Sequence, residues 1–137
     1  MLRVIAAAPA AITASVALAS VAPASPFLPS PPYVAHVEWA KWGDLSSLRV
    51  FPTESGRLAA GQLGTTAQAD AAWTEVLTLS PDADIPGMRD QFDCHWQLAE
   101  FAMPGKTSWN LEPWRPEVGG EQMLATHCNP GGTEEPF

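Results

Sequence analysis

Two short stretches rich in β-branched and aromatic residues, 36–42 and 47–52, lie on either side of the turn sequence Gly-Asp-Leu-Ser. This pattern predicts an antiparallel hairpin, whose second strand ends at Pro52 because proline cannot donate a hydrogen bond to a sheet. Side chains of a strand alternate between its faces, so Trp39 and Trp42 cannot both enter the same core. One of them is expected to face outward, to meet a second layer or to follow a bulge.

Apolar residues at helical spacing follow twice along the chain. Thr65 and Gln68 form a capping box, which predicts a helix that ends near Ser80. A second helix is expected to start near Asp84 or Pro86, with Asp84 as its N-terminal cap, and to stop at Pro104. The apolar stripe of the first helix is expected to hold Ala69, Ala72, Trp73, Val76 and Leu77. The broad stripe of the second is expected to hold Met88, Phe92, His95 or Trp96, Ala99 and Phe101 to Met103.

The remaining segments complete the predicted architecture. Residues 54–66 are Gly-rich and are expected to be irregular, whereas residues 107–112 are expected to form a third strand. Residues 120–127 are expected to form a short helix or turn. The fold class is therefore α+β, with a small antiparallel sheet, made of the hairpin and the third strand, packed against two main helices.

Residues 1–24 have the three-part pattern of a secretory signal peptide: the basic Arg3, a long uncharged apolar run, and the small-residue exit Ala-Pro-Ala. We therefore expect cleavage and export. The alternative is an uncleaved membrane anchor, since the run approaches the roughly 20 residues that span a bilayer. Composition divides the rest into a Pro-rich linker (25–33), a single domain (34–128) and a flexible acidic tail (129–137).

The charge balance narrows the range of partners. The chain carries 15 acidic and 7 basic residues, for a net charge of −8. Nucleic acids and anionic membranes are bound by clustered Lys and Arg, so neither is expected as a partner. The expected location is extracellular or associated with the cell wall, and the expected partner is a protein or a cell-envelope polymer.

Cys94 and Cys128 are the only cysteines of the chain. An exported chain meets oxidising conditions, so we expect a structural disulfide that joins the second helix to the C-terminal segment. Two alternatives remain: a nucleophile made of Cys94 with His95, and a zinc site built from both cysteines with His95 and His127. The export context favours the disulfide over both.

Four motifs stand out along the domain: Val-Glu-Trp-Ala-Lys-Trp (37–42), Ser-Leu-Arg-Val-Phe-Pro-Thr (47–53), Asp-Gln-Phe-Asp-Cys-His (90–95) and Trp-Asn-Leu-Glu-Pro-Trp-Arg (109–115). With these motifs, residues 34–128 resemble a family of secreted actinobacterial proteins, domain of unknown function 2599. The resemblance implies an exported, disulfide-bonded domain from a mycobacterium-like organism. It implies no activity and no catalytic residue.

The spacing of Asp82, Asp84 and Gly87, with Asp93 at the twelfth position, is similar to a calcium-binding loop. Its fifth position is Pro86, which has no side-chain oxygen, and Asp93 is shorter than the usual glutamate. The start of a helix explains the same residues more simply, with Asp84 as the cap and Asp82 beside the positive end of the helix dipole. Weak calcium binding is therefore only a further alternative, and no cofactor is expected.

Six tryptophans are present, and most are expected in the core. Trp39 or Trp42, together with Trp114, are the candidates for an exposed platform that binds a ligand. No nucleophile elbow or phosphate-binding loop is present, so no catalytic residue is assigned. The sequence favours a non-catalytic interaction domain. The alternative is a compact secreted hydrolase of cell-wall material, which requires two carboxylates across a cleft.

Overall fold

The computed structural model describes residues 28–133 of the chain. The expected signal peptide lies outside the described residues, as do parts of the expected linker and tail. The elements along the chain are β1 (Val34–Trp42), β2 (Leu45–Pro52), α1 (Glu54–Ala60), α2 (Thr66–Leu79), the 3₁₀ turn η1 (Pro81–Ala83), α3 (Met88–Ala102), β3 (Trp109–Leu111) and α4 (Gly120–Ala125).

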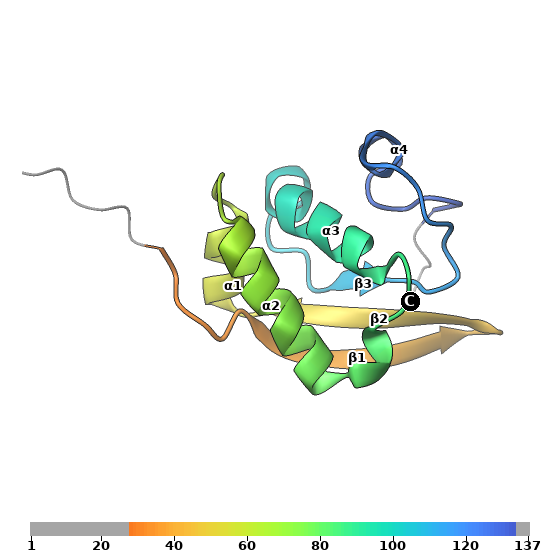
Figure 1. Cartoon of the computed structure of the whole chain (residues 1–137), viewed down its shortest axis with the longest axis horizontal. Helices are drawn as coiled ribbons and strands as arrows, with labels where there is room; N and C mark the ends of the chain where they lie inside the picture. Colours follow the sequence, from red (N-terminus) through yellow and green to blue (C-terminus); the bar gives the residue numbers. More distant parts are fainter. Residues whose placement is uncertain (1–27, 134–137) are drawn as a thin grey trace, which may run out of the picture.

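The three strands form one antiparallel sheet in the order β1-β2-β3, and the helices cover one of its faces (Figure 1). Leu48 of β2 lies opposite Trp39 on one side and Leu111 on the other. Residues opposite one another in neighbouring strands share a face of the sheet, and both leucines are fully buried. This face is therefore the core face, and the α+β prediction is confirmed.

Aromatic rings from the helices and the sheet meet in the core. The ring centroid of Phe92 lies 5.4 Å from that of Trp73, 6.1 Å from Trp96 and 6.0 Å from Trp109. The indole N–H of Trp96 donates a hydrogen bond of 3.0 Å to the hydroxyl of Thr65. Aromatic pairs of this kind contribute about 0.5–1.5 kcal/mol beyond their buried area. The cluster therefore holds α2 and α3 against the sheet.

Helix α1 occupies a segment that was predicted to be irregular, and that prediction is wrong for residues 54–60. Thr53 caps the helix, because its side-chain oxygen accepts a hydrogen bond from the N–H of Gly56 at 2.9 Å. A Cβ atom on Gly56 would lie 2.2 Å from the carbonyl oxygen of Tyr33. This glycine therefore allows the helix to approach the start of β1 and does not mark a loop.

The starts of α2 and α3 also differ from the prediction. The N-cap of α3 is Gly87, in a left-handed conformation with φ of 86°, whereas Asp84 ends the 3₁₀ turn η1. The prediction that Asp84 caps the second main helix is therefore wrong. Thr65 precedes α2 as expected, but its side chain makes no capping hydrogen bond. Its hydroxyl accepts the indole N–H of Trp96.

The chain after β3 is fastened to the rest of the domain in two places. Cys94 of α3 is bonded to Cys128, which confirms the predicted disulfide. Glu112 and Arg115 form an ion pair of 2.7 Å whose side chains are 1% and 0% exposed. Arg115 also donates a hydrogen bond of 3.1 Å to the carbonyl oxygen of Pro130. The disulfide and the ion pair together hold the C-terminal segment against the domain.

Candidate functional site

The predicted platform combines Trp114 with either Trp39 or Trp42, and the structure places these residues on different parts of the sheet. Trp39 and Trp42 are 41% and 53% exposed, but their spacing of three places them on opposite faces of β1. Trp39 lies toward the helices, where its indole N–H donates to the hydroxyl of Ser80 at 3.0 Å. Trp114 follows β3, beyond the other edge of β2, and the guanidinium of Arg115 lies 4.5 Å from its ring centroid. The platform of Trp114 with one of the two β1 tryptophans stays a prediction.

The three aspartates of the predicted calcium loop lie in different settings. Asp82 is exposed within η1, and Asp84 is the residue that ends it. The carboxylate of Asp93 accepts two hydrogen bonds of 2.9 Å from Nε of Arg89, so it belongs to an ion pair on α3. Within residues 28–133, no group of three or more His, Cys, Asp or Glu side chains is arranged to hold a metal ion.

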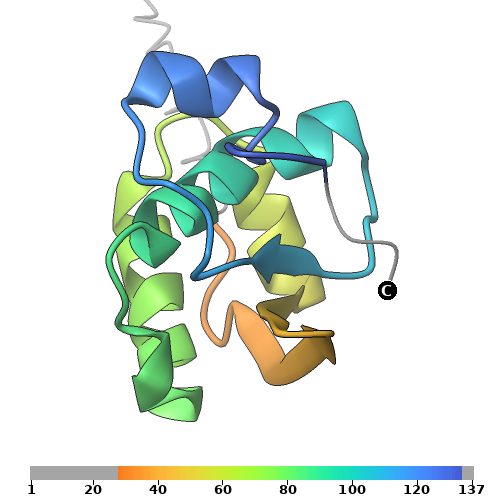
Figure 2. The same cartoon turned by 90° about the vertical axis from the view of Figure 1, so that its right-hand side faces the viewer.

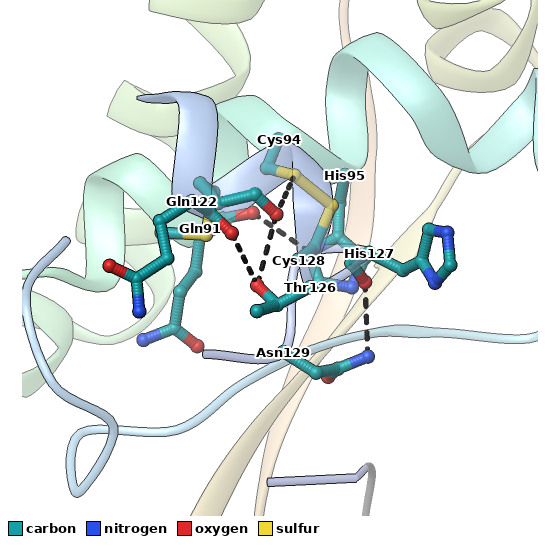
Figure 3. The surroundings of a disulfide bond; sticks show 9 residues. Gln91, Cys94, His95, Gln122, Thr126, His127, Cys128 and Asn129 are labelled. Carbon is teal, nitrogen blue, oxygen red and sulfur yellow. Dashed lines mark hydrogen bonds between the residues drawn. A yellow bond between two sulfur atoms is a disulfide. The ribbon is translucent and has the colours of Figure 1, made fainter. Parts of the chain in front are cut away.

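The disulfide removes both alternatives that were considered for the cysteines. The Cα atoms of Cys94 and Cys128 are 5.6 Å apart, and both sulfurs are engaged in the S–S bond. Neither is then a thiolate that could attack a substrate or bind zinc. Figure 3 shows the bond joining α3 to the segment after α4, with the ring of His127 pointing away from the sulfurs.

A groove runs beside α3 and is the most site-like feature of the described chain. It consists of two hollows of about 470 and 480 Å³ that share Asp93, Gln97 and Leu124 in their walls. The first lies between α3 and the α1–α2 connection, and the second lies between α3 and α4. Figure 2 shows α4 lying across the upper side of α3. We call this feature the α3 groove.

Large apolar side chains at the margins of the α3 groove are exposed. Leu63, Phe101 and Leu124 line the first hollow and are 91%, 55% and 48% exposed. They come from the α1–α2 connection, the end of α3 and α4. The indole of Trp96 lines the same hollow and is only 3% exposed, so it belongs to the core beneath. Apolar side chains left in water around a concave surface are typical of an interaction site.

The charged residues of the α3 groove are mostly acidic. Asp90 and Asp93 line the second hollow, and Arg89 of the first hollow is paired with Asp93 and, at 2.6 Å, with Asp70. Burial alone would lower the pKa of Arg89, but its hydrogen bonds and charge interactions with Asp93 and Asp70 outweigh burial and raise that pKa. Among these residues, the groove is lined by Asp90, Asp93 and Arg89, so its lining carries two negative charges and one positive charge.

The arrangement supports binding more readily than catalysis. Asp90 and Asp93 project from the same helix, one turn apart, and therefore do not face each other across the space that a substrate would occupy. The carboxylate of Glu112 is 1% exposed and is paired with Arg115 beneath the surface.

None of the helices between residues 28 and 133 has the length and apolar composition that crossing a bilayer requires.

Sequence reasoning missed the α3 groove. Its exposed apolar residues come from three separate elements, and one of them, Leu63, follows a helix that was not predicted. Phe101 was assigned to an apolar stripe facing the core. One feature of the sequence did indicate that Leu63 is exposed. Leu63 lies between Gly61 and Gly64, which are typical of a turn, and a large apolar side chain in a turn is seldom buried.

Comparisons with known proteins identify relatives but no activity. The family described as a protein of unknown function, DUF2599, matches residues 34–131. An uncharacterized protein of Mycobacterium tuberculosis is 64% identical over 100 residues, which cover 73% of this chain and 67% of the relative. An uncharacterized protein of Mycobacterium leprae is 48% identical over 97 residues, which cover 71% of this chain and 78% of the relative. No solved structure matches significantly.

Proposed function

This chain belongs to the DUF2599 family of proteins of unknown function, and we propose that it is an exported, non-catalytic module that binds a partner protein in the α3 groove. The observation that carries the proposal is the exposure of Leu63, Phe101 and Leu124 around one concave surface. Export is supported by the N-terminal sequence pattern and by the disulfide, which persists in oxidising compartments.

The expected occupant is an amphipathic helix of the partner. A helix laid into a groove anchors itself through apolar side chains at positions i, i+3, i+4 and i+7. The two hollows adjoin along α3, which is 15 residues long, and at about 1.5 Å per residue this gives a surface about 22 Å long. That length matches four turns of a bound helix, which is enough for such a row of anchors.

The charge of the occupant follows from the charge of the groove. Asp70, Asp90 and Asp93 outnumber Arg89 on this side of the domain, and the whole chain carries a net charge of −8. Complementary charges steer association and suppress wrong partners. The partner helix is therefore expected to carry Lys and Arg beside its apolar stripe.

A protein partner is favoured over a cell-wall polymer for a structural reason. Sugar rings stack on exposed aromatic faces, and the exposed tryptophans of β1 lie on opposite faces of the strand. Two of the three exposed apolar residues around the α3 groove are leucines, which pack well against aliphatic side chains. The hydrolase alternative has no support from the geometry, because Asp90 and Asp93 do not converge on one substrate position.

The proposal is tested with two labelled model peptides of 14 residues, both helical and both with leucine on one face. One carries lysine on the other face, and the second carries glutamate. Fluorescence anisotropy should show saturable binding of the lysine peptide and at least tenfold weaker binding of the glutamate peptide. Phe101→Ser should weaken binding of the lysine peptide at least tenfold, because the side chain is an exposed anchor and not part of the core.

Leu79→Ser is the matched control. Leu79 is 50% exposed, at the end of α2, and does not line the α3 groove. Its substitution should leave peptide affinity within twofold. Equal binding of both peptides, or equal losses in the Phe101 and Leu79 variants, would show that the groove does not select a cationic helix. If soluble wall fragments bind in place of the peptides, and Phe101→Ser weakens the binding of the fragments, the partner is a polymer and not a protein.

A further inference from the structure

The wall that α4 contributes to the α3 groove is held by a small cluster outside the main core. The main core is built from residues up to Leu111 and contains no residue of α4. A separate cluster holds the buried side chains of Cys94, Met123 and Cys128, and Met123 is the buried residue of α4. The position of α4 on α3 therefore depends on the disulfide and on the packing of one apolar side chain.

Helix α4 has little stability of its own. It is six residues long, and its N-cap, Gly119, makes no side-chain hydrogen bond. Helices shorter than about 12 residues are marginal in water unless tertiary packing holds them. After α4, His127 and Cys128 have positive φ of 50° and 66°, a conformation that costs free energy in residues other than glycine. The segment therefore needs an attachment to keep its shape, and the disulfide provides one.

The chain on either side of α4 is fixed independently of the disulfide. Arg115 lies before α4, in the buried ion pair with Glu112. Pro130 and Gly132 lie after it, and their carbonyl oxygens accept hydrogen bonds of 3.1 and 2.8 Å from Nη1 of Arg115. Residues 116–129 therefore form a loop whose two ends stay in place when the disulfide is broken. Opening of such a loop is a local event that leaves the main core folded.

The disulfide lies in the wall of the α3 groove. Cys94 lines the second hollow of the groove, together with Met123 of α4, and Leu124 of α4 lines both hollows. Cys128 lines a separate hollow of about 330 Å³, which gives a small thiol a path to the bond. Figure 3 shows the bond joining α3 to the segment after α4. The bond therefore fixes the two helices between which the second hollow lies.

We propose that the disulfide is a redox switch for the α3 groove: the groove binds its partner when the bond is formed, and reduction by a dithiol weakens binding because α4 leaves α3. The inference rests on the proposed function, since it assigns regulation to the same site. Reduction removes the attachment on which the position of α4 depends, and with it the exposed anchor Leu124. The main core stays folded because it contains neither cysteine.

The reduction is a thiol–disulfide exchange in two steps. A thiolate of the dithiol attacks Sγ of Cys128 and forms a mixed disulfide, and Sγ of Cys94 leaves as a thiolate that takes up a proton. The second thiol of the reagent, as a thiolate, then displaces Sγ of Cys128, which also takes up a proton. The dithiol gives two electrons and two protons and becomes a cyclic disulfide, and the protein disulfide becomes two thiols.

The first measurement follows the release of α4 in the absence of any peptide. ¹H–¹⁵N NMR spectra of the protein are recorded before and after addition of dithiothreitol. The amide signals of Met123 and Thr126, whose N–H groups bond within the α4 segment in the oxidised protein, should move to random-coil positions. The amide signals of Val50 and Phe92, which belong to the main core, should keep their native positions.

The second measurement follows binding of the lysine peptide by fluorescence anisotropy. Reduction should weaken binding at least tenfold. The double variant Cys94→Ser/Cys128→Ser should bind as weakly as the reduced protein and should not respond to dithiothreitol, which controls for effects of the reagent itself. Coupling between two equilibria is reciprocal. A saturating amount of the lysine peptide should therefore make the disulfide of the parent protein at least tenfold harder to reduce in a dithiothreitol redox buffer.

The two measurements separate a failure of the switch from a failure of the proposed function. Equal affinity before and after reduction, or native amide signals of Met123 in the reduced protein, would overturn the switch and leave the proposed function in place. Loss of the native signals of Val50 and Phe92 would show that reduction unfolds the whole domain, which would also overturn the switch. Absence of binding to the oxidised protein, with α4 released on reduction, would overturn the proposed function and with it the control of binding.

Discussion

The buried ion pair between Glu112 and Arg115 offers the sharpest test of what holds the C-terminal segment. Nε of Arg115 donates to Oε2 of Glu112 at 2.7 Å, and neither side chain is more than 1% exposed. The hydroxyl of Ser47 donates to the other carboxylate oxygen at 2.9 Å, and Arg115 donates to the carbonyl oxygen of Gly132 at 2.8 Å. Arg115→Met would leave a buried carboxylate without its counter-charge.

The expected loss can be worked out from these contacts. Removing one partner of a buried pair costs about 3–5 kcal/mol, because the remaining charge stays desolvated. Native domains are stable by only about 5–15 kcal/mol, so the loss is a large share of the total. At about 4–8 °C per kcal/mol for a domain of this size, the Tm should fall by at least about 12 °C. The double variant Glu112→Gln/Arg115→Met removes the buried charge and should recover at least about 2 kcal/mol.

Urea unfolding of the oxidised protein, followed by circular dichroism, measures these free energies. Arg89→Met is the matched control, because its ion pair with Asp93 is about one-third exposed, with side-chain exposures of 35% and 33%. Such a pair contributes about 0–1 kcal/mol. The reasoning is refuted if Arg115→Met costs no more than Arg89→Met, or if the double variant is less stable than Arg115→Met alone.

Three further changes have defined outcomes. Reduction of the bond between Cys94 and Cys128, which are separated by 34 positions, should lower the free energy of unfolding by about 3–4 kcal/mol; equal urea midpoints with and without reductant would contradict this. Gly56→Ala should cost at least about 2 kcal/mol, because the new Cβ would meet the carbonyl oxygen of Tyr33, whereas Gly120→Ala, with nothing within 4 Å of its Cβ, should change stability by under about 1 kcal/mol. Millimolar calcium chloride should leave the Tm unchanged, and a rise of several degrees would restore the calcium-loop hypothesis.

The strands and the two main helices were predictable because their signals are local. The hairpin follows from β-branched and aromatic residues around a turn, and β3 from the short stretch around Trp109. Helix α1 was not predictable in this way. A glycine such as Gly56 usually indicates a loop. In the fold it allows the helix to contact the backbone of Tyr33, which is 23 positions away, and a contact over that distance in sequence leaves no local pattern from which it could be predicted.

The candidate sites were less predictable than the fold. The disulfide required only the pairing of two cysteines, but the α3 groove depends on which large apolar residues are left exposed after packing. Phe101 and Trp96 belong to the same helix and are 55% and 3% exposed. Helical periodicity placed both on one broad stripe. What separates them is the packing of Trp96 against Tyr33 and Trp109, which are distant in the sequence.

The central claim, a protein partner in the α3 groove, is tested most directly by site-specific photo-crosslinking in a mycobacterial host. A photoreactive phenylalanine analogue replaces Leu63 in one variant and Leu79 in the other, and mass spectrometry sequences the cross-linked peptide. The account predicts one partner protein, cross-linked from position 63 through a segment rich in Lys, Arg and apolar residues, and lost when Phe101→Ser is added. Equal cross-linking from both positions, or an acidic cross-linked segment, would contradict it.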